Sequence, residues 1–274
     1  MMRDDQFRRL LDDFGYSWEG YRKVRKGVVK RLVRHMGEIG VRDAEDYMEL
    51  VKRDLEVRQK TRLLMTVSVS RFFRDHPLWI YLKEFLLPEL AAENKDGVAV
   101  WSAGCALGQE VYSFTMLWRY LEEESGPLPP LHLYATDINR EYLRRAEAGL
   151  YDTRAAGEIP ACLGERYLRQ EGESYLVTEA ARRGITWRVH DLAGPPPAED
   201  FFHLVFLRNS LLTYYRKERQ GGMLRGIAKA LKPWGFLVIG WHEVPPAGDL
   251  ECLEIKECPG VLRVPRGGLK TPFL

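Results

Sequence analysis

The sequence predicts an α/β protein, with a mostly parallel sheet, an antiparallel hairpin after it and a small all-helical domain before it. Three observations support this expectation. The first 67 residues show only the helical spacing of apolar side chains. From residue 98 onward, short apolar runs alternate with helical patterns, as parallel strands joined by crossover helices require. The last two apolar runs bracket Pro259-Gly260, which is typical of a hairpin.

The predicted N-terminal domain spans residues 1–67. Apolar side chains recur at three- and four-residue spacing in two of its segments, at Phe7, Leu10, Leu11 and Phe14 and at Tyr47, Leu50, Val51 and Leu55. Between them, the predicted helix Tyr21–Met36 has one apolar stripe, whereas its other faces are basic and carry no acidic residue. The basic positions are Arg22, Lys23, Arg25, Lys26, Lys30, Arg31 and Arg34.

This basic helix has two interpretations. Most basic helix faces are simply solvated. In a protein with a formal net charge of only +2, however, a helix of one sign concentrates a local field that suits an acidic partner. The stretch lacks interleaved exposed aromatic residues and glycines, so we expect no nucleic-acid partner.

Composition sets limits on the class of protein. A chain of 274 residues with 45% hydrophobic residues can bury one large domain and one small domain. No apolar run reaches the roughly 20 residues that cross a bilayer, and the charged start Met1–Asp5 does not resemble a signal peptide. The four cysteines lack C-x-x-C spacing and histidine partners, so we expect no metal site. The simplest expectation is a reduced, soluble, cytoplasmic protein without membrane insertion.

The predicted second domain spans residues 68–274. It begins with a helical run after Arg74 that ends near Pro88. The expected strands are Val98–Trp101, Leu131–Ala135, Ile185–Val189, Leu204–Leu207 and Phe236–Ile239, and the hairpin joins residues 252–255 to 261–264. The expected helices are Gln109–Leu121, Arg140–Ala148 and Arg216–Leu231. Residues 151–183 show no regular pattern, and we expect them to form an insertion beside the site.

The junction after the first strand reads Val100-Trp101-Ser102-Ala103-Gly104-Cys105-Ala106-Leu107-Gly108-Gln109-Glu110. In an open α/β sheet, ligands bind at the carboxyl ends of the strands, and glycines remove the Cβ atoms that would block close approach. The turn has no Gly-Lys-Ser/Thr for a triphosphate and no G-x-G-x-x-G spacing. It therefore favours a nucleoside ligand that carries an amino acid, such as S-adenosylmethionine.

Three consecutive predicted strands are followed by polar side chains at the same sheet edge. Asp137 can accept both ribose hydroxyls of a nucleoside; its alternative role is the N-cap of the helix that begins near Arg140. Asp191 is placed to accept from an adenine amino group, or else it is a turn aspartate before Gly194. Asn209 follows the next strand. In register with the glycine turn, these residues predict a nucleoside site.

In order along nearly the whole chain, these motifs resemble those of the chemotaxis receptor methyltransferases of the CheR type. The matching elements are the basic helix, Ser68-Val69-Ser70-Arg71-Phe72-Phe73-Arg74-Asp75, the glycine turn through Ser113, Ala135-Thr136-Asp137-Ile138, Arg208-Asn209 and Gly240-Trp241-His242-Glu243. Members of this family transfer methyl from S-adenosylmethionine to glutamates of receptor helices and release S-adenosylhomocysteine. The resemblance implies a Rossmann-like class I methyltransferase fold and a role in signalling adaptation.

The resemblance also implies a set of cofactor-binding residues: Ser68, Ser70, Arg74, Ala103, Gly104, Glu110, Asp137, Asp191, Leu192, Arg208 and Asn209. Glu110 can accept from the ammonium group of the cofactor, or it is a first-turn acid that the helix dipole favours. Arg74 can hold a carboxylate, or it is a salt-bridged surface arginine. A glutamate with an ordinary pKa of about 4.3 is already a nucleophile at neutral pH, so catalysis is mainly alignment.

The sequence departs from the family pattern chiefly on the acceptor side. Ser68 and Ser70 stand where the family has asparagine and threonine, and Thr213 stands where it places a substrate-orienting tyrosine. The neighbouring Tyr214 is the candidate substitute and joins Arg74 as a catalytic candidate. Two alternatives follow from this departure: a cofactor-binding regulatory or scaffold protein without catalysis, or a methyltransferase of the same fold with another acceptor.

Overall fold

The computed structural model describes residues 2–248 and 250–265. Two compact units divide the chain. The first is formed by the residues up to Val67 together with Asn209–Gly221, and the second by Ser68–Arg208 together with the chain from Gly222 onward. The predicted domain of residues 1–67 does not include Asn209–Gly221, which belong with it in the structure.

The first unit is helical, and its helices pack on one apolar core. They are α1 (Asp4–Phe14), α2 (Trp18–Tyr21), α3 (Arg25–Glu38), α4 (Ala44–Arg53), α5 (Leu55–Leu64) and α13 (Leu211–Tyr214). The apolar positions of the predicted stripe at Val28, Leu32 and Met36 are buried in this core. Asp43 and Asp54 cap α4 and α5 by accepting from backbone N–H groups in the first turn of each helix.

Two predicted helices of this unit are broken in the structure. The expected continuous helix Tyr21–Met36 is interrupted by a turn at residues 22–24, because Tyr21 ends α2 and its hydroxyl is held by the carbonyl of Met65 at 2.9 Å. The apolar spacing that runs on to Leu55 crosses the cap Asp54, and Leu55 is exposed. Tertiary contacts and caps therefore override the simple spacing here.

Seven strands of the second unit, within the described residues, form one sheet in the order β6-β2-β1-β7-β8-β10-β9. They are β1 (Val98–Ala103), β2 (Leu131–Asp137), β6 (Ile185–Val189), β7 (Phe202–Leu207), β8 (Leu231–Ile239), β9 (Leu253–Glu254) and β10 (Val261–Val264). The pairs among the first five strands of this order are parallel, whereas β10 is antiparallel to β8 and β9. The predicted strands and the closing hairpin are confirmed.

The order of the strands creates a switch point beside β1. The chain runs from β1 to β2 on one side, and β7 later pairs with the other side of β1. Every residue of β1 and β7 is buried, as expected for central parallel strands covered on both faces. In open α/β sheets, the crevice outside such a switch point is where ligands bind.

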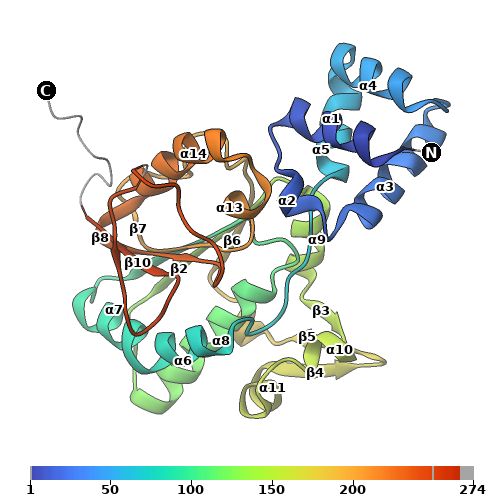
Figure 1. The fold of residues 1–274 in the computed structure, drawn as a ribbon. Coiled ribbons are helices and arrows are strands. Elements are labelled where there is room, and N and C mark those ends of the chain that lie inside the picture. The colour runs from blue at the N-terminus through green and yellow to red at the C-terminus, as the bar shows by residue number, and fades with distance from the viewer. Residues whose placement is uncertain (1, 249, 266–274) are drawn as a thin grey trace, which may run out of the picture. The chain divides into compact units, whose positions relative to one another are not determined.

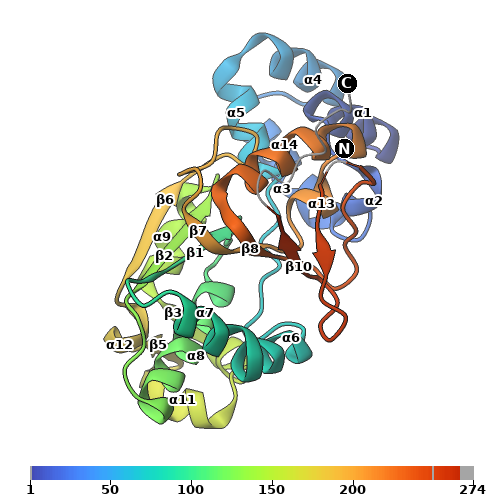
Figure 2. The same cartoon turned by 90° about the vertical axis from the view of Figure 1, so that its left-hand side faces the viewer.

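Helices cover both faces of this sheet. Helices α6 (His76–Tyr81), α7 (Leu87–Glu93) and α8 (Gln109–Ser125) lie on one face, and the part of α14 (Lys217–Ala230) from Gly222 onward lies on the other (Figures 1 and 2). The predicted helix Arg140–Ala148 is confirmed as α9, with Asn139 as its N-cap. No helix among the described residues is long and apolar enough to cross a bilayer.

Pro88 does not end a helix, contrary to the prediction. A π-helical turn, η1 (Leu82–Leu86), leads into α7, and Pro88 occupies the first turn of α7. Proline cannot donate to the carbonyl of a preceding turn, and a wider turn accommodates this interruption without ending the helical path.

Residues 151–183 are not irregular, contrary to the prediction. They complete a small three-stranded antiparallel sheet in the order β3-β5-β4, with short helices around it. Its elements are β3 (Leu150–Asp152), α10 (Thr153–Ala156), α11 (Ala161–Tyr167), β4 (Leu168–Glu171), β5 (Ser174–Val177) and α12 (Glu179–Arg182). Strands of three or four residues are too short to show a period-two pattern in sequence.

Candidate functional site

The glycine turn leaves the carboxyl end of β1 with three left-handed residues in close succession. Gly104 has φ 85°, Ala106 has φ 49° and Gly108 has φ 83°. The N–H groups of Gly104 and Cys105 both donate to the carbonyl of Thr136 on β2, at 2.8 and 2.9 Å. The turn is therefore tied to the neighbouring strand before α8 begins at Gln109.

Gly108 has a packing role in the structure. A Cβ at this position would lie 2.8 Å from the Cβ of Ala146 on α9 and 3.2 Å from the ring of Trp187 on β6. The missing side chain therefore makes room for these neighbours within the protein, and a ligand approach at Gly108 stays a prediction. Ala103 and Gly104 lie at the end of β1, as predicted.

Asp137 lies at the carboxyl end of β2 and is tied to the same turn. Its Oδ2 accepts from the N–H of Ala106 at 3.0 Å, and its Oδ1 accepts from the N–H of Asn139 at 2.8 Å. The alternative role as the cap of α9 is excluded, because Asn139 accepts from Glu141 N–H and is that cap. Burial raises the pKa of the Asp137 carboxyl, although these two backbone bonds lower it. Each carboxylate oxygen keeps lone-pair capacity for a further donor, such as a ribose hydroxyl.

A buried arginine joins the glycine-turn helix α8 to residues 68–75, which we call the arginine motif. Arg208, at the end of β7, has a side chain that is 3% exposed. Its Nη1 donates to the Glu110 carboxylate at 3.1 Å, and its Nη2 donates to Asp75 Oδ2 at 2.6 Å and to the carbonyl of Arg74 at 2.9 Å. Glu110 Oε1 also accepts from the hydroxyl of Ser102 at 2.9 Å. Arg208 therefore organises carboxylates and a loop, rather than presenting a free guanidinium.

Arg74 lies in a strained turn that this cluster holds. Its neighbours Phe73 and Asp75 both have positive φ angles, 47° and 61°. The carbonyl of Arg74 accepts from Arg208 and from the indole N–H of Trp79, while Phe73 N–H donates to the hydroxyl of Ser113 at 2.9 Å. The guanidinium of Arg74 makes a long contact of 3.5 Å with the carbonyl of Val69. The backbone is thus anchored, and the charged end is left partly exposed.

The small sheet also reaches the site, as expected for the insertion. The hydroxyl of Tyr151 on β3 donates to the carbonyl of Leu107 in the glycine turn at 2.6 Å. Glu158, between α10 and α11, accepts from the side chain of Arg71 at 2.7 Å and from the N–H of Phe72 at 3.1 Å. The insertion therefore holds both the glycine turn and the arginine motif.

The remaining predicted residues of the second unit lie in loops. Asp191 and Leu192 follow β6 and are partly exposed, and Asp191 Oδ1 accepts from Ala193 N–H at 3.0 Å in a turn. Ser68 and Ser70 are partly exposed at the start of the arginine motif, where the N–H of Ser70 donates to the carbonyl of Ser68 at 2.9 Å. Asp137, Glu110 and Arg208 are brought together around the turn and its helix, whereas no contact given by the structure ties the two serines to this cluster.

Asn209 and Tyr214 belong to the helical unit rather than to the sheet unit. Asn209 has a positive φ of 52° directly after Arg208 in the chain. Tyr214 ends α13, and its ring packs edge-to-face on Tyr21, with 5.1 Å between the centroids.

Asp75, Ser102 and Tyr151 were missed as contributors to the site. Asp75 is named in the sequence analysis only as the last residue of the motif at residues 68–75, and this place was a usable signal. The local sequence carries no signal for Ser102 or Tyr151, because their partners Glu110 and Leu107 are found only once the strands are packed.

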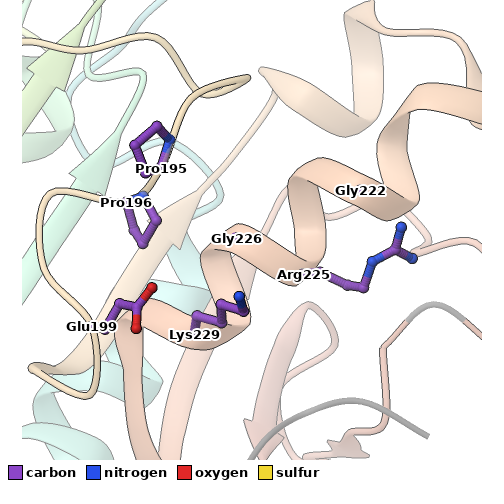
Figure 3. A pocket seen from close by; sticks show the side chains of 7 residues that line it. All are labelled: Pro195, Pro196, Glu199, Gly222, Arg225, Gly226 and Lys229. Carbon is purple, nitrogen blue, oxygen red and sulfur yellow. The ribbon is translucent and has the colours of Figure 1, made fainter.

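A separate pocket in the second unit is lined by the loop after β6 and by α14 (Figure 3). Its lining residues are Pro195, Pro196, Glu199, Gly222, Arg225, Gly226 and Lys229. None of the predicted cofactor residues is among them. We therefore place the candidate site at the glycine turn, where the buried carboxylates are, rather than in this pocket.

Comparison with known proteins agrees with this geometry. Residues 68–257 match the family model described as CheR methyltransferase, SAM binding domain, where SAM is S-adenosylmethionine. The chain is 29% identical to a chemotaxis protein methyltransferase of Listeria monocytogenes over 81% of this chain and 79% of that protein. It is 31% identical to one of Vibrio parahaemolyticus over 77% of each. An uncharacterized 104.1 kDa protein of Rhodobacter capsulatus is 33% identical over 79% of this chain, but the chain spans only 23% of that protein.

Among solved structures, the DszA carbon methyltransferase matches 70% of this chain and 46% of that chain, with 16% identity and a TM-score of 0.39.

The family model covers more than half of the chain, and it matches the unit that contains the glycine turn, Asp137 and the Arg208 cluster. The carboxylates of Asp137 and Glu110 retain capacity for donors of the kind that this ligand offers. The chain therefore belongs to the CheR methyltransferase family and has the S-adenosylmethionine-binding domain of that family.

Proposed function

We propose that this protein transfers methyl from S-adenosylmethionine to glutamate side chains of chemoreceptor-like helices, in signalling adaptation. The observation that carries the proposal is the Arg208 cluster. One buried guanidinium bonds both Glu110, on the donor side, and the backbone of Arg74, the residue expected to meet the acceptor. The relatives named chemotaxis protein methyltransferase support the same reaction.

On the donor side, Asp137 accepts the ribose hydroxyls and Glu110 accepts the ammonium group, beside Ala103 and Gly104. Asp191 and Leu192 meet the adenine, and Ser68, Ser70 and Asn209 complete the site. In this proposal Arg208 is a positioning residue, because both of its terminal nitrogens donate to protein acceptors. The bound cofactor supplies an electrophilic methyl on a sulfonium.

On the acceptor side, the substrate carboxylate needs no general base, because it is ionised at neutral pH. Arg74 orients this carboxylate toward the methyl group, and Tyr214 donates a hydrogen bond to its second oxygen. Alignment of two reacting groups is worth several powers of ten in rate, so these two residues account for most of the catalysis on this side.

The acceptor docks on α3 and on the turn before it in this proposal, but through fewer basic residues than the sequence suggests. Arg25 pairs with Asp4, Arg34 with Glu38 and Arg22 with Glu19. Arg31 donates to the carbonyls of Leu64 and Thr66, both at 2.8 Å, so it holds the unit together. Within the part of the chain that the structure describes, Lys23, Lys26 and Lys30 are exposed and have no ion-pair partner. These three lysines form the proposed docking face for acidic receptor helices.

The test is incubation of the full chain with methyl-labelled S-adenosylmethionine and receptor cytoplasmic fragments. Base-labile label on receptor glutamates supports the proposal. Cofactor binding without transfer to any acceptor indicates the alternative of a regulatory or scaffold protein, and label only on other acceptors indicates a different substrate.

The Tyr214 assignment is tested with Tyr214→Phe against Thr213→Val as the matched control. Tyr214→Phe removes one hydroxyl and should slow turnover about tenfold or more, with little change in affinity for S-adenosylhomocysteine. If Thr213→Val has the larger effect, Thr213 is the orienting residue instead.

A further inference from the structure

The chain segment that follows β7 is held by the helical unit through its backbone. The N–H of Ser17 donates to the carbonyl of Tyr214 at 2.8 Å, and the N–H of Arg216 donates to the carbonyl of Gly15 at 3.1 Å. Tyr16 and Tyr215 form an antiparallel bridge between these bonds, with their rings 5.0 Å apart. Residues 213–216 are therefore fixed against residues 15–21 like a short strand pair.

Gly20 lies at the closest point of this contact. A Cβ on Gly20 would come within 2.1 Å of the carbonyl oxygen of Thr213 and 3.2 Å of the Cα of Tyr214. These are backbone atoms, which cannot turn aside as the end of a flexible side chain can. Gly20 sits inside α2, where its φ is not left-handed, so the requirement for glycine comes from close approach alone.

Tyr21 completes the contact from the next position. Its side chain is 2% exposed, its ring meets the ring of Tyr214 at an interplanar angle of 67°, and its hydroxyl donates to Met65. Gln220, which is also buried, closes the other side of the segment by donating to the carbonyls of Leu212 and Tyr215. The ring of Tyr214 thus packs against Tyr21, whose own hydroxyl is held by a hydrogen bond to Met65.

We infer that Gly20 and Tyr21 are positioning residues that seat Tyr214, so that the helical unit is part of the acceptor-orienting apparatus as well as a docking module. The inference rests on the proposed role of Tyr214 in orienting the acceptor. A three-residue turn joins α2 to α3, and in it the N–H of Val24 donates to the carbonyl of Tyr21. Lys23 lies in this turn and Lys26 and Lys30 lie on α3, so the docking lysines directly follow Gly20 and Tyr21 in the chain. Receptor docking on α3 and the placement of Tyr214 are then linked within one unit.

The first test compares Gly20→Ala with Gly37→Ala. Both glycines are helical, but a Cβ on Gly37 meets nothing within 4 Å. Gly20→Ala should displace residues 213–214, lower kcat on the order of 10- to 100-fold and leave the Kd for S-adenosylhomocysteine and the acceptor KM within about twofold. Gly37→Ala should match the wild type in all of these. A Gly20→Ala protein that is folded and retains wild-type kcat overturns the inference.

The second test guards against simple loss of stability in the Gly20 variant. Tyr21→Phe keeps the ring against Tyr214 and loses the hydroxyl bond, whereas Tyr21→Leu loses the ring as well. Both are measured at a temperature at which thermal unfolding shows that the variants are folded. The kcat of Tyr21→Leu should fall well below that of Tyr21→Phe; equal values for the two overturn the role of the ring.

Amide hydrogen exchange separates this inference from the proposed function. Residues 211–216 should exchange faster in Gly20→Ala and Tyr21→Leu than in Gly37→Ala, whether or not the protein methylates receptors. If the wild type binds S-adenosylhomocysteine but transfers no methyl, the proposed function fails. The exchange result still tests whether Gly20 and Tyr21 hold the Tyr214 segment in place. If the exchange rates at residues 211–216 are unchanged, Gly20 and Tyr21 do not hold the Tyr214 segment in place.

Discussion

The charged cluster around the glycine turn and the chain segment around Tyr214 are built from different interactions. Around the glycine turn, directional hydrogen bonds and ion pairs hold Asp137, Glu110 and the Arg74 loop. Around Tyr214, the segment is held by backbone hydrogen bonds to Gly15 and Ser17, by aromatic rings and by one close glycine contact. A polar cluster loses much when one partner is removed, whereas ring packing tolerates a substitution of similar shape. Departures from the family pattern at Thr213 and Tyr214 therefore fall in the segment where rings pack, rather than in the charged cluster.

The sharpest way to break this comparison is Arg208→Met. The substitution leaves Glu110 and Asp75 without their shared cation, so we expect the free energy of unfolding of the second unit to fall by about 3–5 kcal/mol. Urea unfolding followed by tryptophan fluorescence measures this loss. The control Arg263→Met removes a partly exposed pair with Glu89 and should cost less than about 1 kcal/mol. Similar losses for the two variants would contradict the importance of the polar cluster.

Arg74→Ala should separate activity from stability. Its guanidinium makes a long contact of 3.5 Å with the carbonyl of Val69, so the free energy of unfolding should change by less than about 1 kcal/mol. The rate of methyl transfer should fall by roughly 10²–10³-fold. Single-turnover assays with labelled donor measure the transfer. Arg71→Ala is the matched control from the same motif, because Arg71 pairs with Glu158 on the insertion. An Arg74→Ala protein with full activity would remove Arg74 from the mechanism.

The sheet beneath the donor site should lose stability in acid. His203 on β7 accepts from Ala99 N–H on β1, and burial lowers its pKa to about 4. Between pH 6.5 and 4 the unfolded chain binds a proton at this residue and the folded chain does not, so stability falls as the pH decreases through this window. We expect His203 to contribute roughly 1–3 kcal/mol of this fall.

His203→Asn keeps an acceptor for Ala99 N–H and removes the titration. It should flatten the pH dependence of unfolding between pH 6.5 and 4. His35 in the helical unit also has a pKa lowered by burial, and its Nδ1 lies 2.9 Å from the hydroxyl of Tyr47. If His35→Asn alone removed the acid sensitivity of the sheet unit, the assignment to His203 would be wrong.

The smallest effect should come from the docking lysines. Changing Lys23, Lys26 and Lys30 together to Glu should raise the KM for an acidic receptor fragment about three- to tenfold at low salt. It should leave the affinity for S-adenosylhomocysteine unchanged. The difference should shrink at about 0.5 M salt, because exposed charges are screened. A triple variant at the exposed Lys95, Lys229 and Lys256 makes the same change in charge away from α3 and should bind the acceptor normally.

Much of the sheet unit was predictable because its signals are local. Buried parallel strands appear as short apolar runs, and the turn after β1 carries its glycines in the sequence, so β1, β2, β6, β7 and the closing hairpin were placed correctly. The family pattern of residues 68–75 likewise indicated a site at Arg74. Where contacts are distant, prediction failed: the small sheet within residues 151–183, the turn that splits α2 from α3 and the role of Asp75 depend on partners far along the chain.

The amino-acid sequence by itself determined the class of fold, the parallel sheet and the place of the glycine turn after β1, because strand patterns and left-handed glycines are properties of neighbouring residues. Only the tertiary structure decided which charged side chains are exposed to solvent and which form ion pairs or hydrogen bonds within the protein. In the sequence, Arg208 and Arg31 cannot be told apart from exposed basic residues. In the structure, Arg208 pairs with two carboxylates and Arg31 donates to two backbone carbonyls. The tertiary structure also assigned Tyr214 to the helical unit, since a glycine contact and a ring contact form only when residues some 190 positions apart are folded together.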